Sequence, residues 1–273
     1  NQAGEKSLFI RSDFYAFFWQ NRLHFSKSDT FRRFFCNRMV LMLQKKEVKV
    51  LNHTFSVDRM EKKYCLTPVQ KSLLFHRLSQ VMELDGNGTQ GGYLVRSVYF
   101  DSIYDNDYFD KVNGVEIRKK IRLRIYRPDQ ESVKLELKQK WGAAQRKKTM
   151  WIPRSLAEDM LCGEYGGLSG LGEALSDEIY SILELGAYRP KCIIEYHRAA
   201  FTERSNDIRI TFDSDIRASA SCGGFFRPDL SMLPLLNEPV LEVKYNGFLL
   251  SNIKQILDLA DSSETSVSKY AMS

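Results

Sequence analysis

The segment from Ile117 to Tyr126 constrains the fold more than any other part of this chain. Apolar and basic residues alternate along it, in the order Ile117-Arg118-Lys119-Lys120-Ile121-Arg122-Leu123-Arg124-Ile125-Tyr126. Successive side chains of a β-strand point to opposite faces of the sheet. The segment therefore predicts a strand with one mainly apolar face and one strongly basic face.

A period-two pattern of this kind recurs along most of the chain and predicts about eight strands. They fall at residues 58–66, 92–101, 115–126, 132–141, 146–152, 191–201, 207–213 and 239–245. Helices are expected between them, at residues 67–84, 103–112, 155–161, 171–185 and 251–259. The first helix has a clear start, because Thr67 is a capping residue, Pro68 suits the first helical position and Gln70 completes a capping box. The fold class predicted is α+β.

Four further strands carry charged residues on one face only. On that face lie Arg59, Glu61 and Lys63; Lys134, Glu136, Lys138 and Lys140; Arg209, Thr211 and Asp213; and Glu242 and Lys244. Taken alone, the charged face of any one strand could be the solvent-exposed outer surface of a β-sandwich. Like charges stacked along one strand face repel each other, however, and an outer surface would mix the signs more freely. We therefore expect an eight-stranded antiparallel β-barrel with its basic faces inward, its interior holding one ligand, and helices packed on the outside.

The composition fits an anionic ligand without demanding one. The chain has 273 residues, a formal net charge of +6 and a pI near 8.9. Its five cysteines are scattered and include no C-x-x-C pair, which argues against a zinc ribbon or a redox dithiol. No stretch approaches the roughly 18 to 20 apolar residues of a membrane-spanning helix. We expect a cytoplasmic protein with no integral membrane segment.

Residues 1–53 differ from the rest of the chain. They mix aromatic residues such as Phe17, Phe18 and Trp19 with basic residues such as Arg32 and Arg33. Two interpretations stay open: a disordered leader outside the fold, or an arm that contacts a membrane surface or a partner. The catalytic or binding domain is expected at residues 54–273.

Eight short motifs, taken in order, resemble one family. They are Arg59-x-Glu61-x-Lys63-Tyr64, Arg96-Ser97-Val98-Tyr99-Phe100-Asp101, Arg118-Lys119-Lys120-x-Arg122-x-Arg124-x-Tyr126, Leu135-Glu136-Leu137-Lys138, Glu195-Tyr196-His197-Arg198-x-Ala200-Phe201, Ile208-Arg209-Ile210-Thr211-Phe212-Asp213, Leu241-Glu242-Val243-Lys244-Tyr245 and Ser268-Lys269-Tyr270. Over residues 55–273 this order resembles the catalytic domain of the vacuolar transporter chaperone (VTC) polyphosphate polymerases. That domain belongs to the triphosphate tunnel metalloenzymes, together with the CYTH phosphatases.

The resemblance implies a tunnel barrel that takes the γ-phosphate of ATP and extends a polyphosphate chain, with Mn²⁺ or Mg²⁺ as cofactor. It implies phosphate-binding and catalytic roles for Lys63, Arg122, Arg124, Lys138, Arg198 and Arg209, and substrate-binding roles for Lys148, Ser268 and Lys269. Glu242, with Glu136 as a second candidate, would hold the metal. Arg146 and Lys147 are open alternatives to Lys148.

Two features depart from the family pattern. Arg59 stands where the CYTH enzymes carry a glutamate, which argues against a plain triphosphatase. Arg198 has the opposite strand parity from Glu195, so both would line the barrel only if a bulge intervened.

Other functions stay open at this point. A tunnel triphosphatase or a nucleotidyl cyclase would use a similar barrel, and a non-catalytic module would bind polyphosphate or nucleic acid without turnover. A nucleic-acid binder interleaves exposed aromatic residues with basic ones, whereas the basic strands here alternate mainly with aliphatic residues. ATP and inorganic polyphosphate are therefore the expected partners, and nucleic acid is not.

Overall fold

The computed structural model describes residues 53–56, 60–86, 91–142, 144–260 and 263–273, with backbone alone for 53–56. Its strands form one antiparallel sheet in the order β1-β7-β6-β5-β4-β8-β9-β11-β2, with β10 paired to β9 and β3 paired to β8. The strands are β1 (His53–Ser56), β2 (Met60–Cys65), β3 (Glu83–Leu84), β4 (Tyr93–Ser102), β5 (Ile117–Ile125), β6 (Ser132–Trp141), β7 (Ala144–Pro153), β8 (Tyr188–Glu203), β9 (Ile208–Ser219), β10 (Leu233–Leu236) and β11 (Val240–Tyr245). All eight predicted strands are present, and the additions are the short strands β1, β3 and β10.

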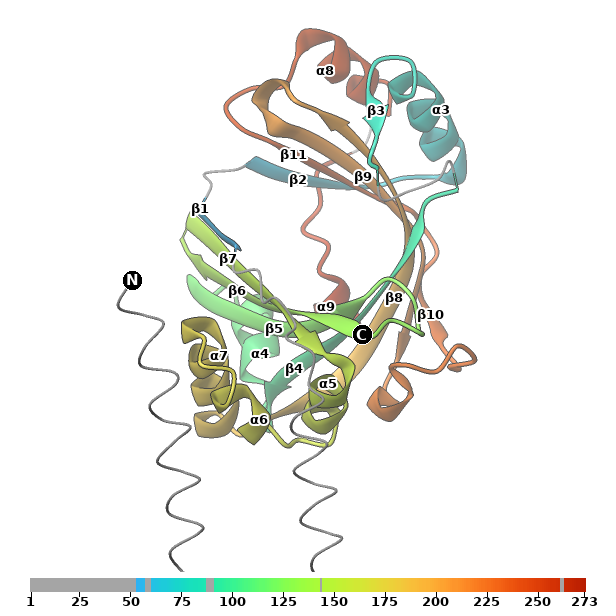
Figure 1. Cartoon of the computed structure of the whole chain (residues 1–273). Coiled ribbons are helices and arrows are strands. Elements are labelled where there is room, and N and C mark those ends of the chain that lie inside the picture. The colour runs from blue at the N-terminus through green and yellow to red at the C-terminus, as the bar shows by residue number, and fades with distance from the viewer. Residues whose placement is uncertain (1–52, 57–59, 87–90, 143, 261–262) are drawn as a thin grey trace, which may run out of the picture. The chain divides into compact units, whose positions relative to one another are not determined.

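The apolar strand faces point outward and are covered by helices (Figure 1). The helices are α3 (Pro68–Leu78), α4 (Asn106–Val112), α5 (Arg154–Leu161), α6 (Gly166–Ser169), α7 (Ala174–Leu185), α8 (Ser251–Asp258) and α9 (Lys269–Met272). One core joins β5 and β6 to α5, α6 and α7, and it includes the fully buried Leu123, Leu135 and Ile179. A second core joins β9 and β11 to α3 and α8, around Leu74, Phe212 and Val243. Burial of these faces stabilises the sheet and leaves the opposite faces for the interior.

Helix α3 begins as predicted and ends earlier than predicted. The Thr67 side chain accepts a hydrogen bond from the Gln70 backbone, and the Gln70 side chain accepts one from the Thr67 backbone. The predicted end at residue 84 is wrong, because the helix stops at Leu78. The chain then turns, and Glu83–Leu84 pairs with β8 instead.

The sheet curls into the wall of a barrel-like tunnel, which confirms the predicted α+β fold class (Figure 1). Its terminal strands are β1 and β2, and no hydrogen-bonded ladder joins these two within the described residues. The chain end crosses from one side of this opening to the other. Thr265 donates a backbone hydrogen bond to Lys63 of β2, and Tyr270 stacks on Tyr99 of β4. We call residues 264–273 the C-terminal segment.

The helices that the structure describes are all too short or too polar to cross a membrane. Residues 1–52 lie outside the described part, so the two interpretations of the N-terminal arm stay predictions. Residue 53, which we had assigned to that arm, already belongs to β1.

Candidate functional site

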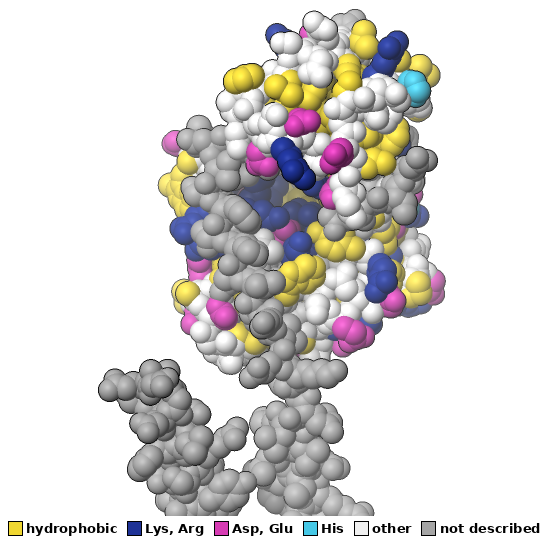
Figure 2. Space-filling model, turned by 45° about the horizontal axis from the view of Figure 1, so that its top comes forward, with side chains coloured by type: hydrophobic (Ala, Val, Ile, Leu, Met, Phe, Trp, Pro, Cys, Tyr) yellow, Lys and Arg dark blue, Asp and Glu magenta, His cyan; other side chains and the backbone are white. Residues whose placement is uncertain are grey.

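The inner faces of the strands enclose a cavity of about 630 Å³. Figure 2 shows the hollow, with Lys and Arg side chains gathered inside it. The basic residues that line the cavity are Lys63, Lys120, Arg122, Arg124, Lys138, Lys147, Arg198, Arg209, Lys244 and Lys269. Four carboxylates, Glu61, Glu136, Asp207 and Glu242, line it with them. The charged strand faces therefore meet in one enclosed space rather than facing bulk solvent.

Strands β5 and β6 supply one wall, and their register explains its charge. Residues on the inner face pair across the ladder as Arg118 with Lys140, Lys120 with Lys138, Arg122 with Glu136, and Arg124 with Lys134. Three of these four cross-strand pairs bring like charges together, which destabilises a sheet in the absence of counter-charge. The wall is thus arranged to receive an anion.

Glu136 neutralises the centre of this wall. Its carboxylate accepts a hydrogen bond from Arg122 and pairs with Lys147, and it lies 3.8 Å from Arg124. Burial alone would raise the pKa of Glu136, but these three cations outweigh it and hold the pKa well below its ordinary value. Glu136 is therefore ionised at neutral pH and fixes the guanidinium of Arg122.

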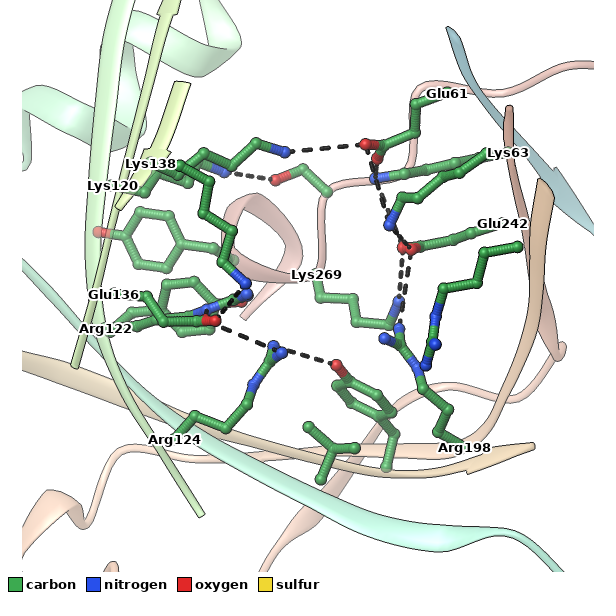
Figure 3. Close-up of a pocket in the computed structure, with 18 of the residues that line it drawn as sticks. Glu61, Lys63, Lys120, Arg122, Arg124, Glu136, Lys138, Arg198, Glu242 and Lys269 are labelled. Carbon is green, nitrogen blue, oxygen red and sulfur yellow. Dashed lines mark hydrogen bonds and ion pairs between the residues drawn. The ribbon is translucent and has the colours of Figure 1, made fainter. Parts of the chain in front are cut away.

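Glu242 stands on the opposite wall, on β11 (Figure 3). It lies 2.9 Å from Lys244, 3.5 Å from Lys269, 3.6 Å from Lys63 and 3.7 Å from Arg198. Burial opposes ionisation, yet the four cations hold the pKa of Glu242 well below its ordinary value. Glu242 is therefore an ionised carboxylate surrounded by four cations.

Asp213 is a buried carboxylate that contacts Arg198 and Lys269, and the sequence pattern did not single it out as a site residue. Arg198 donates two hydrogen bonds to it, at 2.6 and 2.7 Å, and Lys269 donates one at 2.6 Å. Its position on the same strand face as Arg209 was the available signal. The fork of Arg198 is held rigidly by this bidentate contact.

Glu61 is the second carboxylate beside Glu242. Lys63 lies 3.2 Å from Glu61, and Lys244 lies 3.9 Å from it, so the same two lysines contact both carboxylates. Although burial raises the pKa of Glu61, Lys244, Lys138 and Lys63 lower it to about 2. Ionised carboxylates are the ligands that a hard divalent cation prefers, and in the described residues no group of three or more His, Cys, Asp or Glu side chains gathers around such a position. Glu136, the other predicted metal ligand, lies across the cavity in a separate cluster.

Tyrosine phenols supply neutral acceptors for the arginines. Arg122 donates to the Tyr99 hydroxyl at 3.0 Å, and Arg209 donates to the Tyr93 hydroxyl at 3.2 Å. These neutral acceptors add to the carboxylates that also hold the two guanidinium groups, Glu136 for Arg122 and Asp85 for Arg209 at 2.6 Å.

The structure brings ten of the predicted site residues to the cavity: Lys63, Arg122, Arg124, Glu136, Lys138, Arg198, Arg209, Glu242, Ser268 and Lys269. The position expected for Lys148 is wrong. Its side chain lies on the outer face of β7 and pairs with Glu178 of α7, whereas its neighbour Lys147 lines the cavity. Successive residues of a strand point to opposite faces of the sheet, so the adjacent Lys147 and Lys148 point in opposite directions.

The parity conflict at β8 has a simple solution. Tyr196 and Arg198 line the cavity, while Glu195 faces the other way and binds Arg96 at 2.6 Å and Arg217 at 2.9 Å. The β8–β9 register does shift between Glu195 and His197, but Glu195 still does not line the cavity. Arg59 lies outside the described residues.

A family model described as the VTC domain matches residues 58–273. The chain belongs to the VTC domain family. The match begins two residues before β2 and includes every residue that lines the cavity. Among curated proteins, none matches the chain.

Three solved structures are similar to this VTC domain protein at 14% sequence identity. A candidate adenylate cyclase from Bacillus halodurans aligns over 78% of this chain and 95% of its own, with a TM-score of 0.46. A candidate adenylyl cyclase from Hippeastrum with a dominant triphosphatase activity aligns over 78% of this chain and 93% of its own, with a TM-score of 0.47. A candidate adenylate cyclase from Vibrio parahaemolyticus aligns over 80% of this chain and 98% of its own, with a TM-score of 0.45.

Proposed function

We propose that this VTC domain protein is a metal-dependent polyphosphate polymerase that transfers the γ-phosphoryl group of ATP to a growing polyphosphate chain. The observation that carries the proposal is the cavity of about 630 Å³ with ten basic residues and four carboxylates on its walls. A cavity of this charge suits a multiply charged phosphate chain, and the family assignment supports the same substrate class.

Phosphoryl transfer requires in-line positioning and neutralisation of negative charge rather than covalent chemistry by the protein. Arg122 and Arg198 are each held by a buried carboxylate, so their guanidinium groups would clamp phosphate oxygens in fixed positions. Lys138 and Lys269 would add compact positive charges on facing sides of the cavity. The terminal phosphate of the growing chain would act as the nucleophile, so the reaction needs no serine, cysteine or histidine nucleophile.

A divalent cation, Mn²⁺ or Mg²⁺, would be held by Glu242 and Glu61. When bound, it would neutralise charge on the phosphate oxygens and help to align the reacting groups. Lys63 and Lys244, which now contact both carboxylates, would then be free to turn toward phosphate. Glu136 would keep Arg122 and Arg124 in place on the facing wall.

The test is incubation of the full chain with ATP and Mn²⁺, followed by electrophoresis of the products on a polyphosphate gel. We expect long chains from the wild-type protein and a loss of about 100-fold in rate for Glu242→Gln, because metal-assisted charge neutralisation contributes several kcal/mol. Glu178→Gln is the matched control, since it removes a carboxylate on the outer side of β7.

The product decides between this proposal and its alternatives. Free phosphate without chains would indicate a triphosphatase, and a cyclic nucleotide would indicate a cyclase. Binding of polyphosphate without ATP turnover would indicate a non-catalytic binder. Wild-type turnover in Glu242→Gln would refute the metal role.

A further inference from the structure

The basic inner face of β5 and β6 continues past the cavity that the proposed function uses. Lys120 lines the cavity, and two residues earlier on the same face Arg118 pairs in register with Lys140. Lys140 also pairs in register with Gln145 of β7, which is itself a lining residue. The Arg118–Lys140 pair therefore lies immediately beyond the end of the cavity.

Helix α4 adds a third cation to this place. It lies beside the start of β5 (Figure 1), and its last turn carries Lys111. Burial, together with the nearby charges of Arg118, Lys63 and Lys140, lowers the pKa of Lys111. These three cations therefore lie near the start of β5 and repel one another.

These cations differ in one respect from three of those deeper in the cavity. Inside, Arg122, Arg198 and Lys269 each have a carboxylate partner. In the part of the chain that the structure describes, neither an ion pair nor a hydrogen bond engages the side chains of Lys111, Arg118 and Lys140. Like charges directly opposite each other on a ladder destabilise it, so this arrangement lowers stability unless an anion occupies it.

We propose that Lys111, Arg118 and Lys140 form an outer subsite for the part of a polyphosphate chain that extends beyond the cavity. This inference rests on the proposed function. It adds the route of the polyphosphate chain, which would enter or leave the cavity past β5 and α4. Two residues along a strand span about 7 Å, so a triphosphate held deep in the cavity does not reach these side chains, whereas a long chain does.

The experiment compares two ligands, tripolyphosphate and long-chain inorganic polyphosphate, on the full chain by calorimetry. The variant is Lys111→Gln/Arg118→Gln/Lys140→Gln. We expect its affinity for the long chain to fall about tenfold, because the loss of each of the three half-exposed charges weakens binding by a factor of about two. Its affinity for tripolyphosphate should change less than twofold.

The matched control is Lys71→Gln/Arg77→Gln/Lys254→Gln, which removes the same charges from the outer helices α3 and α8. Equal losses for both ligands, an equal loss in the control, or an unchanged long-chain affinity would overturn the inference. So would a loss of binding to phosphatidylserine vesicles with polyphosphate binding intact, because the anion would then be a lipid headgroup. Failure of the wild-type protein to bind tripolyphosphate would instead refute the proposed function.

Discussion

Lys120 shows most clearly how burial and neighbouring cations act on one residue of the cavity. Its ammonium group donates to the Ser268 hydroxyl at 3.1 Å and lies over the Tyr270 ring, and both partners are neutral. Burial, followed by the charges of Lys138 and Lys63, lowers the pKa of Lys120 to about 7. The ordinary value for a lysine is about 10.4, so this group loses its proton within a range that is easily tested.

We predict that tripolyphosphate binds more weakly as the pH rises from 7 to 9. Below pH 7 Lys120 is already protonated, whereas above it binding must first supply a proton to the neutral amine. Lys120→Arg should bind with a flatter pH profile, because arginine stays charged throughout. Calorimetry in buffers of different ionisation enthalpy measures the proton uptake. Identical profiles for the two proteins would contradict the assignment.

The same shift predicts an effect on the stability of the ligand-free protein. Between pH 7 and about 10.4 the unfolded chain binds more protons at Lys120 than the folded chain does, so folding stability rises with pH across this window. Lys120→Met should therefore raise the melting temperature most at pH 7 or below, and the gain should shrink toward pH 10. Thermal unfolding of both proteins at several pH values checks this prediction. A gain in melting temperature that does not change with pH would count against a lowered pKa of Lys120.

Lys269 is the opposite case, a largely buried lysine with two carboxylate partners. Removing its charge leaves Asp213, which is fully buried, with Arg198 as its one remaining cation among the ion pairs of the described residues. We predict that Lys269→Met lowers the free energy of unfolding by about 3 kcal/mol, as breaking a buried ion pair does. Urea denaturation of the ligand-free protein measures this, and a change below about 1 kcal/mol would show that the pair contributes little.

At the scale of the strand, successive side chains point to opposite faces of the sheet, and the two adjacent lysines of β7 test whether the structure orients them correctly. Lys147 lines the cavity and contacts Glu136, while Lys148 contacts Glu178 outside. We predict that Lys147→Gln weakens tripolyphosphate binding about tenfold, in line with the loss of one charge-assisted contact. Lys148→Gln should bind normally and lose no more than about 1 kcal/mol of stability. Equal effects of both variants would refute the orientation.

The strands and their inner faces were predictable because the pattern is local. Alternation along β5, β6, β9 and β11 identifies both the element and the side that bears charge. The pattern does not say which of two adjacent residues points inward, so it favours Lys148 over Lys147, and it lets Glu195 and Arg198 both line the barrel only if a bulge lies between them. The short strands β3 and β10 were missed because two to four residues carry too little periodicity.

The partners of the site residues were less predictable than the residues themselves. Glu61 approaches Glu242 because β2 and β11 are adjacent, although 181 positions separate the two residues in the sequence. Asp213 becomes a site residue because the C-terminal segment brings Lys269 to it. Such contacts are set by tertiary packing, and a strand pattern contains no information on which strands meet.

At the scale of the whole molecule, charge takes part in closing the tunnel. Hydrogen bonds join neighbouring strands from β1 round to β2, and no ladder between these two ends appears in the part of the chain described. Across this opening, Lys138 of β6 lies 3.8 Å from Glu61 of β2, and Lys120 of β5 donates to Ser268 of the C-terminal segment. A phosphate chain bound between the walls would add many such links at once.

We therefore predict that tripolyphosphate stabilises the whole fold and not the cavity residues alone. At about 100 times its dissociation constant, a ligand that binds the folded state raises the free energy of unfolding by about 2.7 kcal/mol. For a protein of this size that corresponds to an increase of roughly 5–10 °C in melting temperature. Sodium chloride at matched ionic strength is the control, since it screens the like charges without linking the walls. An equal shift with both salts would mean that screening alone relieves the repulsion, whereas a larger shift with tripolyphosphate that disappears in Arg122→Gln/Arg198→Gln would place the stabilising anion between the two walls.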